Sequence, residues 1–264
     1  MSDPNRDVVQ RRLEALGFSV RPIAETMDSR QPDLVAQTEG ATMYVEVKTR
    51  SEDRVLRVGM EAVPIAGTND IIIDLDKHNG LSAEIKHASS QLGSAAGADD
   101  FRLLWYRADT GPFVHNTKEQ VGSTLYGMRM VLAQSHGLEM RLWHCAYAGY
   151  ADFFRFPEID GAMIEVDGLI TLFLNPFSSR RDAFASSRIA RVLDGDGAVF
   201  DIRRAIADGK LFAVDGDAPR HSDPELLAHL ASKYPSTTFV RFFRHVAVTT
   251  MTTIDGTQGV SYKT

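Results

Sequence analysis

The sequence predicts an α/β protein with a mixed central β-sheet flanked by helices. Three observations favour this class. Short apolar runs rich in valine, tyrosine and phenylalanine alternate with helix-forming segments along roughly the first 110 residues. A helix-start signal stands at the N-terminus, and a polar turn containing glycine separates two strand-like runs. No repeat or low-complexity linker interrupts this pattern.

The first predicted helix begins at Asp3-Pro4, because an aspartate before a proline is typical of an N-cap followed by the first helical position. Gly17 ends it, and residues 18–23 form a predicted first strand. The helix carries an apolar stripe at helical spacing, made of Val8, Val9, Leu13 and Leu16.

A β-hairpin is predicted next, with strands at 34–36 and 43–48 and a turn at 38–41. A two-residue loop and a four-residue loop are both compatible with this turn. Either loop gives the same register, in which Asp33 faces Glu46. Directly opposed side chains in antiparallel strands have Cβ atoms roughly 4.5–5.5 Å apart.

Lys48 lies two residues beyond Glu46 and therefore points to the same side of the strand. Two carboxylates at this separation repel each other unless a cation lies between them, and a hard divalent ion takes carboxylate oxygens. The alternative is a solvated aspartate beside an exposed Glu–Lys pair. The opposite side of the hairpin would form core through Leu34, Ala36, Met43, Val45 and Val47.

Pro32-Asp33 and Glu46-Val47-Lys48 resemble the motif of the PD-(D/E)XK nuclease superfamily, whose fold is restriction-endonuclease-like. That family has the order helix, strand, hairpin, helix, strand. The same order can be traced here, with a second helix at 82–96 and a strand at 101–106. The resemblance covers roughly the first 110 residues, and it implies a restriction-endonuclease-like core with a C-terminal α+β extension.

The resemblance also implies roles for the matched residues. Asp33 and Glu46 would ligate one or two Mg²⁺ ions, for which Mn²⁺ would substitute, and the carbonyl of Val47 would add a ligand. Lys48 would orient or help to deprotonate the attacking water and stabilise charge on the phosphate.

Gln91 is a further candidate, because many members carry a glutamine or lysine on the helix after the hairpin. It borders the apolar stripe of the second helix, so it is either a site residue or an ordinary helix-flank glutamine. Some relatives take another acidic ligand from the first helix. Asp7 and Glu14 both fall nearly opposite its apolar stripe, and we interpret them as solvated, which leaves the number of metal ions open.

Composition sets limits on the function. The chain has 264 residues, a net charge of −6 and one cysteine, Cys145, which excludes an internal disulfide. No apolar run is long enough to span a bilayer, and we expect a cytoplasmic protein. The acidic total weighs against tight nucleic-acid binding but leaves room for local basic tracks. The best placed are Arg50, Arg54 and Arg57, with another cluster at Arg180, Arg181, Arg188 and Arg191.

The second half of the chain is less informative. We expect a nuclease-like core over 1–130 and a C-terminal α+β region over 131–264, with a soft boundary, for substrate recognition or dimerisation. Its predicted strands are 128–133 and 140–148, which would extend the sheet, together with 153–156 and 169–174, and the range 239–251 ends in a β-branched, threonine-rich strand. Its predicted helices are 180–193 and 223–232.

The sequence thus predicts a Mg²⁺-dependent nuclease acting on DNA, an endonuclease in defence, restriction or repair. Two alternatives stay open: a catalytically silent nucleic-acid-binding or assembly protein on the same fold, and an RNA nuclease. A homodimer is expected, because cutting both strands of a duplex often uses two copies of a site related by a two-fold axis.

Overall fold

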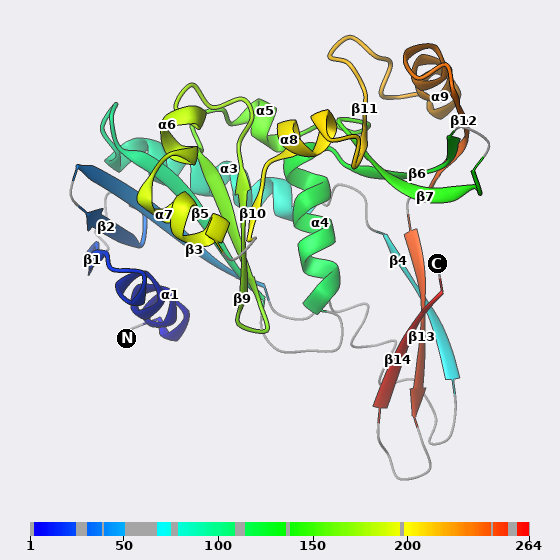
Figure 1. Cartoon of the computed structure of the whole chain (residues 1–264). Helices are drawn as coiled ribbons and strands as arrows, with labels where there is room; N and C mark the ends of the chain where they lie inside the picture. Colours follow the sequence, from blue (N-terminus) through cyan, green and yellow to red (C-terminus); the bar gives the residue numbers. More distant parts are fainter. Residues whose placement is uncertain are drawn as a thin grey trace. The chain divides into compact units, whose positions relative to one another are not determined.

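The chain divides into two compact units in the computed structural model (Figure 1). Unit 1 comprises Met1–Arg50, Asn79–Asp109 and Asp152–Asp208, and unit 2 comprises Ser51–His78, Thr110–Ala151 and Gly209–Thr264. Both of the continuous segments predicted from the sequence, 1–130 and 131–264, contribute to each unit. The structure describes residues 3–24, 31–38, 40–50, 68–74, 79–108, 114–135, 138–195, 198–243, 245–252 and 258–263.

Unit 1 is built on a seven-stranded mixed sheet with the order β1-β2-β3-β5-β8-β9-β10. The pairs β3/β5, β5/β8 and β9/β10 are parallel, and the other three are antiparallel. This confirms the predicted fold class. The strands are β1 (Ser19–Pro22), β2 (Leu34–Thr38), β3 (Ala41–Arg50), β5 (Phe101–Ala108), β8 (Gly161–Val166), β9 (Leu169–Leu174) and β10 (Val199–Phe200).

Helices cover both faces of this sheet. On one face, side chains of α1, α6 and α7 form a core with alternate residues of β2, β3, β5, β8 and β9. The helix α3 packs on β3 and β5 and buries Leu81, Ile85, Ala88 and Leu92 (Figure 1). The helices of unit 1 are α1 (Pro4–Ala15), α3 (Asn79–Ala95), α5 (Asp152–Arg155), α6 (Arg181–Ala185), α7 (Arg188–Gly195) and α8 (Ile202–Ala207).

The first helix begins and ends as its sequence predicts. The Asp3 carboxylate accepts a hydrogen bond from Asn5 N (2.9 Å), and Pro4 occupies the first turn. Gly17 follows with φ +84°, a left-handed conformation that glycine adopts at little cost. α1 therefore stops there, and the chain turns into β1.

The predicted hairpin register is confirmed. Leu34 pairs with Val45, and the pairing continues to Thr38 opposite Ala41. Asp33 stands one residue before the first of these pairs. The five hairpin residues expected in the core are all buried there, namely Leu34, Ala36, Met43, Val45 and Val47.

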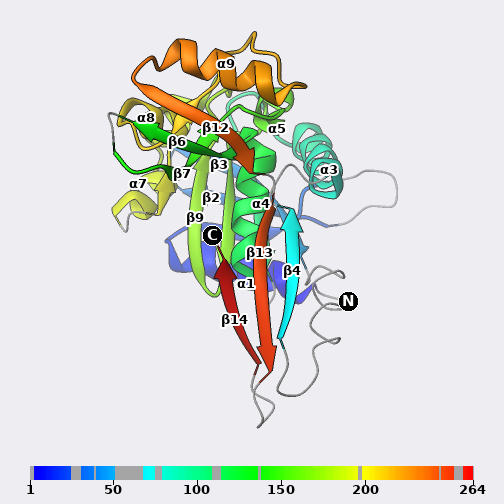
Figure 2. The same cartoon turned by 90° about the vertical axis from the view of Figure 1, so that its right-hand side faces the viewer.

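Unit 2 contains a four-stranded sheet with the order β11-β7-β6-β12 and a three-stranded sheet with the order β14-β13-β4. Figure 2 shows β4, β13 and β14 side by side, and α9 over β12. Its elements are β4 (Thr68–Asp74), α4 (Val114–Tyr126), β6 (Arg129–Ser135), β7 (Arg141–Ala146), β11 (Phe212–Ala213), α9 (Asp223–Lys233), β12 (Thr237–Phe243), β13 (His245–Thr252) and β14 (Gln258–Lys263).

Two strand predictions fail in their sheet assignment. The strands expected to extend the first sheet, β6 and β7, pair with β12 and β11 instead. The threonine-rich strand expected at the end of 239–251 is present as β13, which pairs with β4 and β14, whereas the first residues of that range belong to β12 in the other sheet of unit 2. Apolar alternation predicts that a segment is a strand, but the choice of partner depends on contacts distant in sequence.

Two other elements differ in type or continuity. Residues 153–156, expected as a strand, lie largely in α5, and the Asn175 side chain donates to carbonyl oxygens at its C-terminal end. So short an apolar run does not distinguish a strand from a helix. The helix expected over 180–193 is two helices, because Ser187 Oγ accepts from Ala190 N (3.5 Å) and starts α7 afresh.

In the part of the chain that the structure describes, no helix is long and apolar enough to cross a membrane.

Candidate metal and phosphodiester site

Asp33 is held at the start of β2 by backbone contacts on both sides. Its carbonyl oxygen accepts from Ile23 N (2.9 Å), and its carboxylate Oδ2 accepts from Val47 N (2.8 Å) on β3. The Asp33 side chain thus extends the hairpin pairing by one side-chain bond. This bond fixes the carboxylate beside the strand that carries Glu46 and Lys48.

Glu46 is almost completely buried, with 1% of its surface exposed. Lys48 Nζ donates to Glu46 Oε1 at 2.6 Å, and the Lys48 side chain retains 25% exposure. The second oxygen, Oε2, is buried and has no hydrogen-bond partner within the described residues. A buried carboxylate oxygen without a donor is costly, so this oxygen marks a place for a proton or a cation.

The two acids influence each other electrostatically. Burial, followed by repulsion from the Asp33 carboxylate, raises the pKa of Glu46 to about 7, against the opposing effect of Lys48. Burial also raises the pKa of Asp33 above its ordinary value, although the Val47 N–H and the charges of Lys48 and Arg6 oppose the shift. A carboxyl group whose charge is disfavoured in this way gains most from a bound cation.

Gln91, for which the sequence left both a site role and an ordinary helix-flank role open, lies at the same place. It projects from α3, and its Nε2 donates to the carbonyl oxygen of Gln31 at 3.1 Å, two residues before Asp33. The Gln91 amide also lowers the pKa of Glu46, which places it beside that carboxylate. The structure therefore brings together all four side chains that the sequence singled out, Asp33, Glu46, Lys48 and Gln91.

Arg6, in the first turn of α1, was missed by the sequence analysis. Its positive charge acts on Asp33, and its Nε is buried without a hydrogen-bond partner among the described residues. Asp3, at the N-cap of the same helix, acts on Asp33 in the opposite sense. The apolar stripe of α1 predicts which side of the helix is buried but not how its first turn packs beside Asp33, so Asp3 and Arg6 carried no signal.

The basic residues predicted to contact nucleic acid are only partly placed. Arg50 is the last residue of β3, although its side chain lies outside the described part, and Arg54 and Arg57 lie outside the described residues. Arg180 and Arg181, in the other predicted cluster, are structural: their guanidinium groups pair with Asp160 and Asp201. Of the acids on α1, Glu14 is exposed and accepts from Gln10, as a solvated residue would.

The donor set fits a hard divalent cation. Asp33 and Glu46 supply two carboxylates. The Oε2 of Glu46 is buried and has no hydrogen-bond partner among the residues that the structure describes. No group of three or more His, Cys, Asp or Glu side chains is placed to hold a metal ion in the described ranges. Mg²⁺ suits a pair of acids nevertheless, because it usually keeps several waters and takes one or two carboxylates plus substrate phosphate oxygens.

Searches of protein-family models and of curated proteins find no match to this chain.

Proposed function

We propose that this protein is a Mg²⁺-dependent nuclease that hydrolyses phosphodiester bonds in DNA, with Asp33, Glu46 and Lys48 as its catalytic residues. One observation carries the proposal. The buried Glu46, whose Oε2 has no hydrogen-bond partner within the described residues, lies beside the Asp33 carboxylate and the Lys48 ammonium group at two adjoining strands. Acids and a lysine in this arrangement suit phosphodiester hydrolysis, because two carboxylates can hold a divalent cation and the ammonium group can stabilise charge on the phosphate.

The carboxylates would hold the cation, since Asp33 is fixed by Val47 N–H and Glu46 by Lys48. The carbonyl oxygen of Val47 is a further candidate ligand, because Val47 follows Glu46 on β3 and its N–H binds the Asp33 carboxylate. A divalent ion bound here supplies Lewis-acid activation of water and neutralises charge on the phosphate. Mn²⁺ would substitute, since it accepts the same oxygen ligands.

Lys48 connects the buried acids to solvent. Its Nζ lies 2.6 Å from Glu46 Oε1, yet a quarter of its side chain is exposed. An ammonium in this position can hold the attacking water or the phosphate oxygens by hydrogen bonds, and it stabilises the negative charge that develops at phosphorus. We assign this role to Lys48.

Arg6 and Gln91 would support the site of Asp33, Glu46 and Lys48 without binding the cation. The positive charge of Arg6 acts on Asp33, and it would also favour a bound phosphate at this place. Gln91 positions the segment before Asp33 through its bond to the Gln31 carbonyl. In the proposed reaction, water adds to phosphorus and the bond to O3′ breaks, which leaves a 5′-phosphate and a 3′-hydroxyl.

The test is cleavage by the full-length protein of labelled duplex DNA, single-stranded DNA and tRNA, with Mg²⁺ or with EDTA. We expect DNA cleavage that needs the metal, and a Lys48→Ala variant at least about 100-fold slower. Lys86→Ala is the matched control, because Lys86 is an exposed lysine on α3 of the same unit, and it should cut at the wild-type rate.

Three results would change the assignment. Cleavage of tRNA alone would make the substrate RNA. Binding of DNA without cleavage under any metal would favour the silent binding protein. A Lys48→Ala variant as fast as wild type would mean that the site has been placed on the wrong residues.

A further inference from the structure

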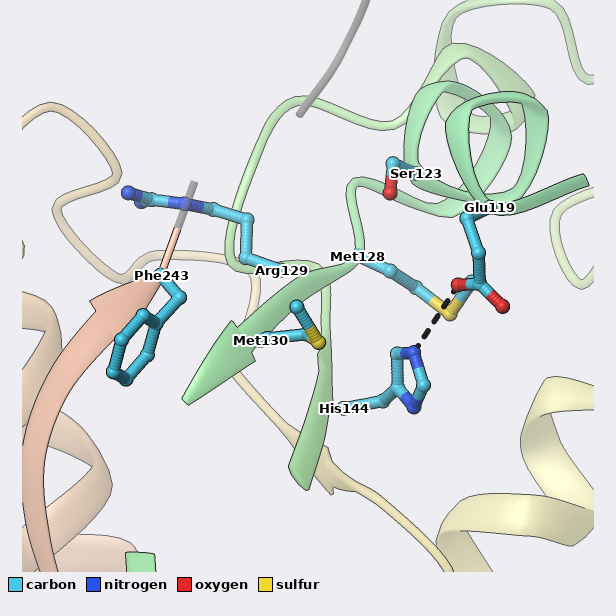
Figure 3. Close-up of a pocket in the computed structure, with 7 residues that line it drawn as sticks. All are labelled: Glu119, Ser123, Met128, Arg129, Met130, His144 and Phe243. Atoms are coloured by element: carbon cyan, nitrogen blue, oxygen red, sulfur yellow. Dashed lines mark hydrogen bonds and ion pairs between the residues drawn. The ribbon is translucent and has the colours of Figure 1, made fainter. Parts of the chain in front are cut away.

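Unit 2 contains a small hollow whose lining differs in chemistry from the Asp33–Glu46 site (Figure 3). Two methionines, a histidine and a glutamate converge on it. They come from α4, β7 and the start of β6. The hollow, here called the Met–His hollow, is lined by Glu119, Ser123, Met128, Arg129, Met130, His144 and Phe243.

The backbone places these side chains together. Met130 and His144 are direct partners in the antiparallel pairing of β6 with β7, so their side chains stand next to each other on one face. Met128 lies two residues before Met130. In Figure 3 the Met128 sulfur lies beside the Glu119 carboxylate and the His144 ring, and the Met130 sulfur lies on the His144 side of β6. Glu119 reaches the same point from α4, and its Oε2 lies 3.3 Å from His144 Nε2.

The guanidinium of Arg129 does not compete for this space. Arg129 alternates with the two methionines and points away from His144 in Figure 3. It pairs instead with Asp223 at 3.0 Å and lies over the Phe242 ring, 4.7 Å from its centre. The centre of the hollow therefore combines two thioethers, an imidazole and a carboxylate, and the nearest arginine is already paired elsewhere.

This donor set selects a particular class of ligand. Thioether sulfur is a soft ligand that favours Cu(I), and imidazole suits copper as well, whereas Mg²⁺ and Ca²⁺ prefer oxygen. One carboxylate balances the charge of one monovalent cation. We propose that the Met–His hollow is a binding site for a soft monovalent metal ion, Cu(I). The ion would be held by the Met128 and Met130 sulfurs and by His144 Nε2, where it would replace the proton that Nε2 shares with Glu119 Oε2, and this proton would leave to solvent.

Packing alone accounts less well for the same residues. Met128 is 7% exposed and would serve as core filler, but a filler has no need of an ion pair at its surface. His144 and Glu119 are each about half exposed, at 46% and 45% of their side chains, so their pairing adds little stability. The proposal is independent of the proposed nuclease function, because it uses no residue of unit 1.

Cys145 is the main complication for a test, because a thiol is also a soft ligand. It follows His144 in β7 but belongs to the buried core on the other face of the sheet. Burial raises the pKa of its thiol to about 12, so the thiolate form is scarce at neutral pH. A Cys145→Ala background removes this ligand altogether, and it is the background in which the site should be tested.

The experiment is a ¹H–¹³C spectrum of the full-length Cys145→Ala protein labelled at the methionine methyl groups, titrated with Ag(I) as a redox-inert substitute for Cu(I). The chain has nine methionines. We expect two of the methyl signals to shift at one equivalent of Ag(I). The Met128→Leu and Met130→Leu variants should each lose one signal and weaken binding by about tenfold or more.

The controls make the result decisive. Met140→Leu removes a methionine of the same unit that is 41% exposed and outside the hollow, and it should leave binding unchanged. Leucine fills nearly the volume of methionine, so the variants should fold, which a thermal melt verifies. Added Mg²⁺ should shift neither signal. The proposal is overturned if no methionine signal shifts. It is also overturned if the signals that shift are still present in both the Met128→Leu and the Met130→Leu spectra.

Discussion

Two buried carboxylates of unit 1 have opposite surroundings. Asp160, before β8, is completely buried and accepts from Arg102 N (2.8 Å), Ser178 Oγ (2.5 Å) and Arg180, whose Nε lies 3.1 Å and 3.2 Å from its two oxygens. Glu46, on β3, is buried to nearly the same degree. Lys48 donates to one of its oxygens and the Gln91 amide lies beside it, but its Oε2 has no hydrogen-bond partner of good geometry within the described residues.

The two acids are buried alike but differ in how far neighbouring donors satisfy them. Arg180 also donates to the carbonyl oxygens of Ala98 and Glu158, so its ion pair with Asp160 ties three loops of unit 1 together. Such an acid is satisfied by the fold alone. Glu46 has fewer donors around it, and burial together with the nearby charge of Asp33 raises its pKa to about 7.

The largest expected effect is on catalysis. Glu46→Gln keeps the size of the side chain and removes the charge that would hold the metal. Loss of metal-dependent stabilisation amounts to several kcal/mol, so we expect DNA cleavage to fall by about 10³-fold or more. Single-turnover cleavage at saturating Mg²⁺ measures this. A rate within a few-fold of wild type would remove Glu46 from the site.

The next effect concerns stability and acts on Asp160. Asp160→Asn leaves the Arg180 guanidinium without its charge partner and turns an amide N–H toward existing donors. We expect a loss of about 3 kcal/mol in the free energy of unfolding. Urea denaturation measures it. A loss as small as that of Asp182→Asn, whose side chain is 86% exposed, would contradict the structural role of Asp160.

The raised pKa of Glu46 should make the protein less stable as the pH rises. Its pKa is raised from about 4.5 to about 7, so the folded metal-free protein binds more protons than the unfolded chain between these values. Stability should therefore fall as pH rises from about 5 to about 8, by on the order of 2 kcal/mol. The decline should be weaker in Glu46→Gln, as urea titrations in EDTA at each pH can show. Equal slopes in the two proteins would mean that Glu46 titrates normally.

The smallest effect is expected at Gln91. Gln91→Ala removes the bond to the Gln31 carbonyl but no proposed ligand, so cleavage should slow by about tenfold. Ser90→Ala, its exposed neighbour on α3, is the control and should not change the rate. A higher KM for Mg²⁺ with little change in kcat would indicate that Gln91 positions Asp33. An unchanged rate would leave Gln91 as an ordinary helix residue.

The hairpin and its site could be predicted from local sequence, because a register follows from the turn and the alternation of side chains. The predicted positions of Asp33, Glu46 and Lys48 all followed from that one register. The partner strands of β6 and β7 could not be predicted, since each is chosen by contacts with distant residues. Arg6 was missed for the same reason: its nearness to Asp33 depends on how α1 packs, which its apolar stripe does not determine.

The interleaving of the two units was also beyond local patterns. β8 and β9 complete the first sheet from the second half of the chain, and no change in composition marks their return. The same limit applies to the Met–His hollow. Met128 and Met130 look like ordinary strand residues until β7 brings His144 opposite Met130.

Direct binding of Mn²⁺, followed by the electron paramagnetic resonance signal of the free ion at pH 8, tests the central claim that the two acids of the hairpin share a cation. The wild-type protein should bind Mn²⁺, and Mg²⁺ should displace it. Glu46→Gln and Asp33→Asn should each weaken binding by at least about tenfold, whereas Glu14→Gln, at an exposed acid of α1, should bind as wild type does. Equal Mn²⁺ affinity in all four proteins would contradict the account.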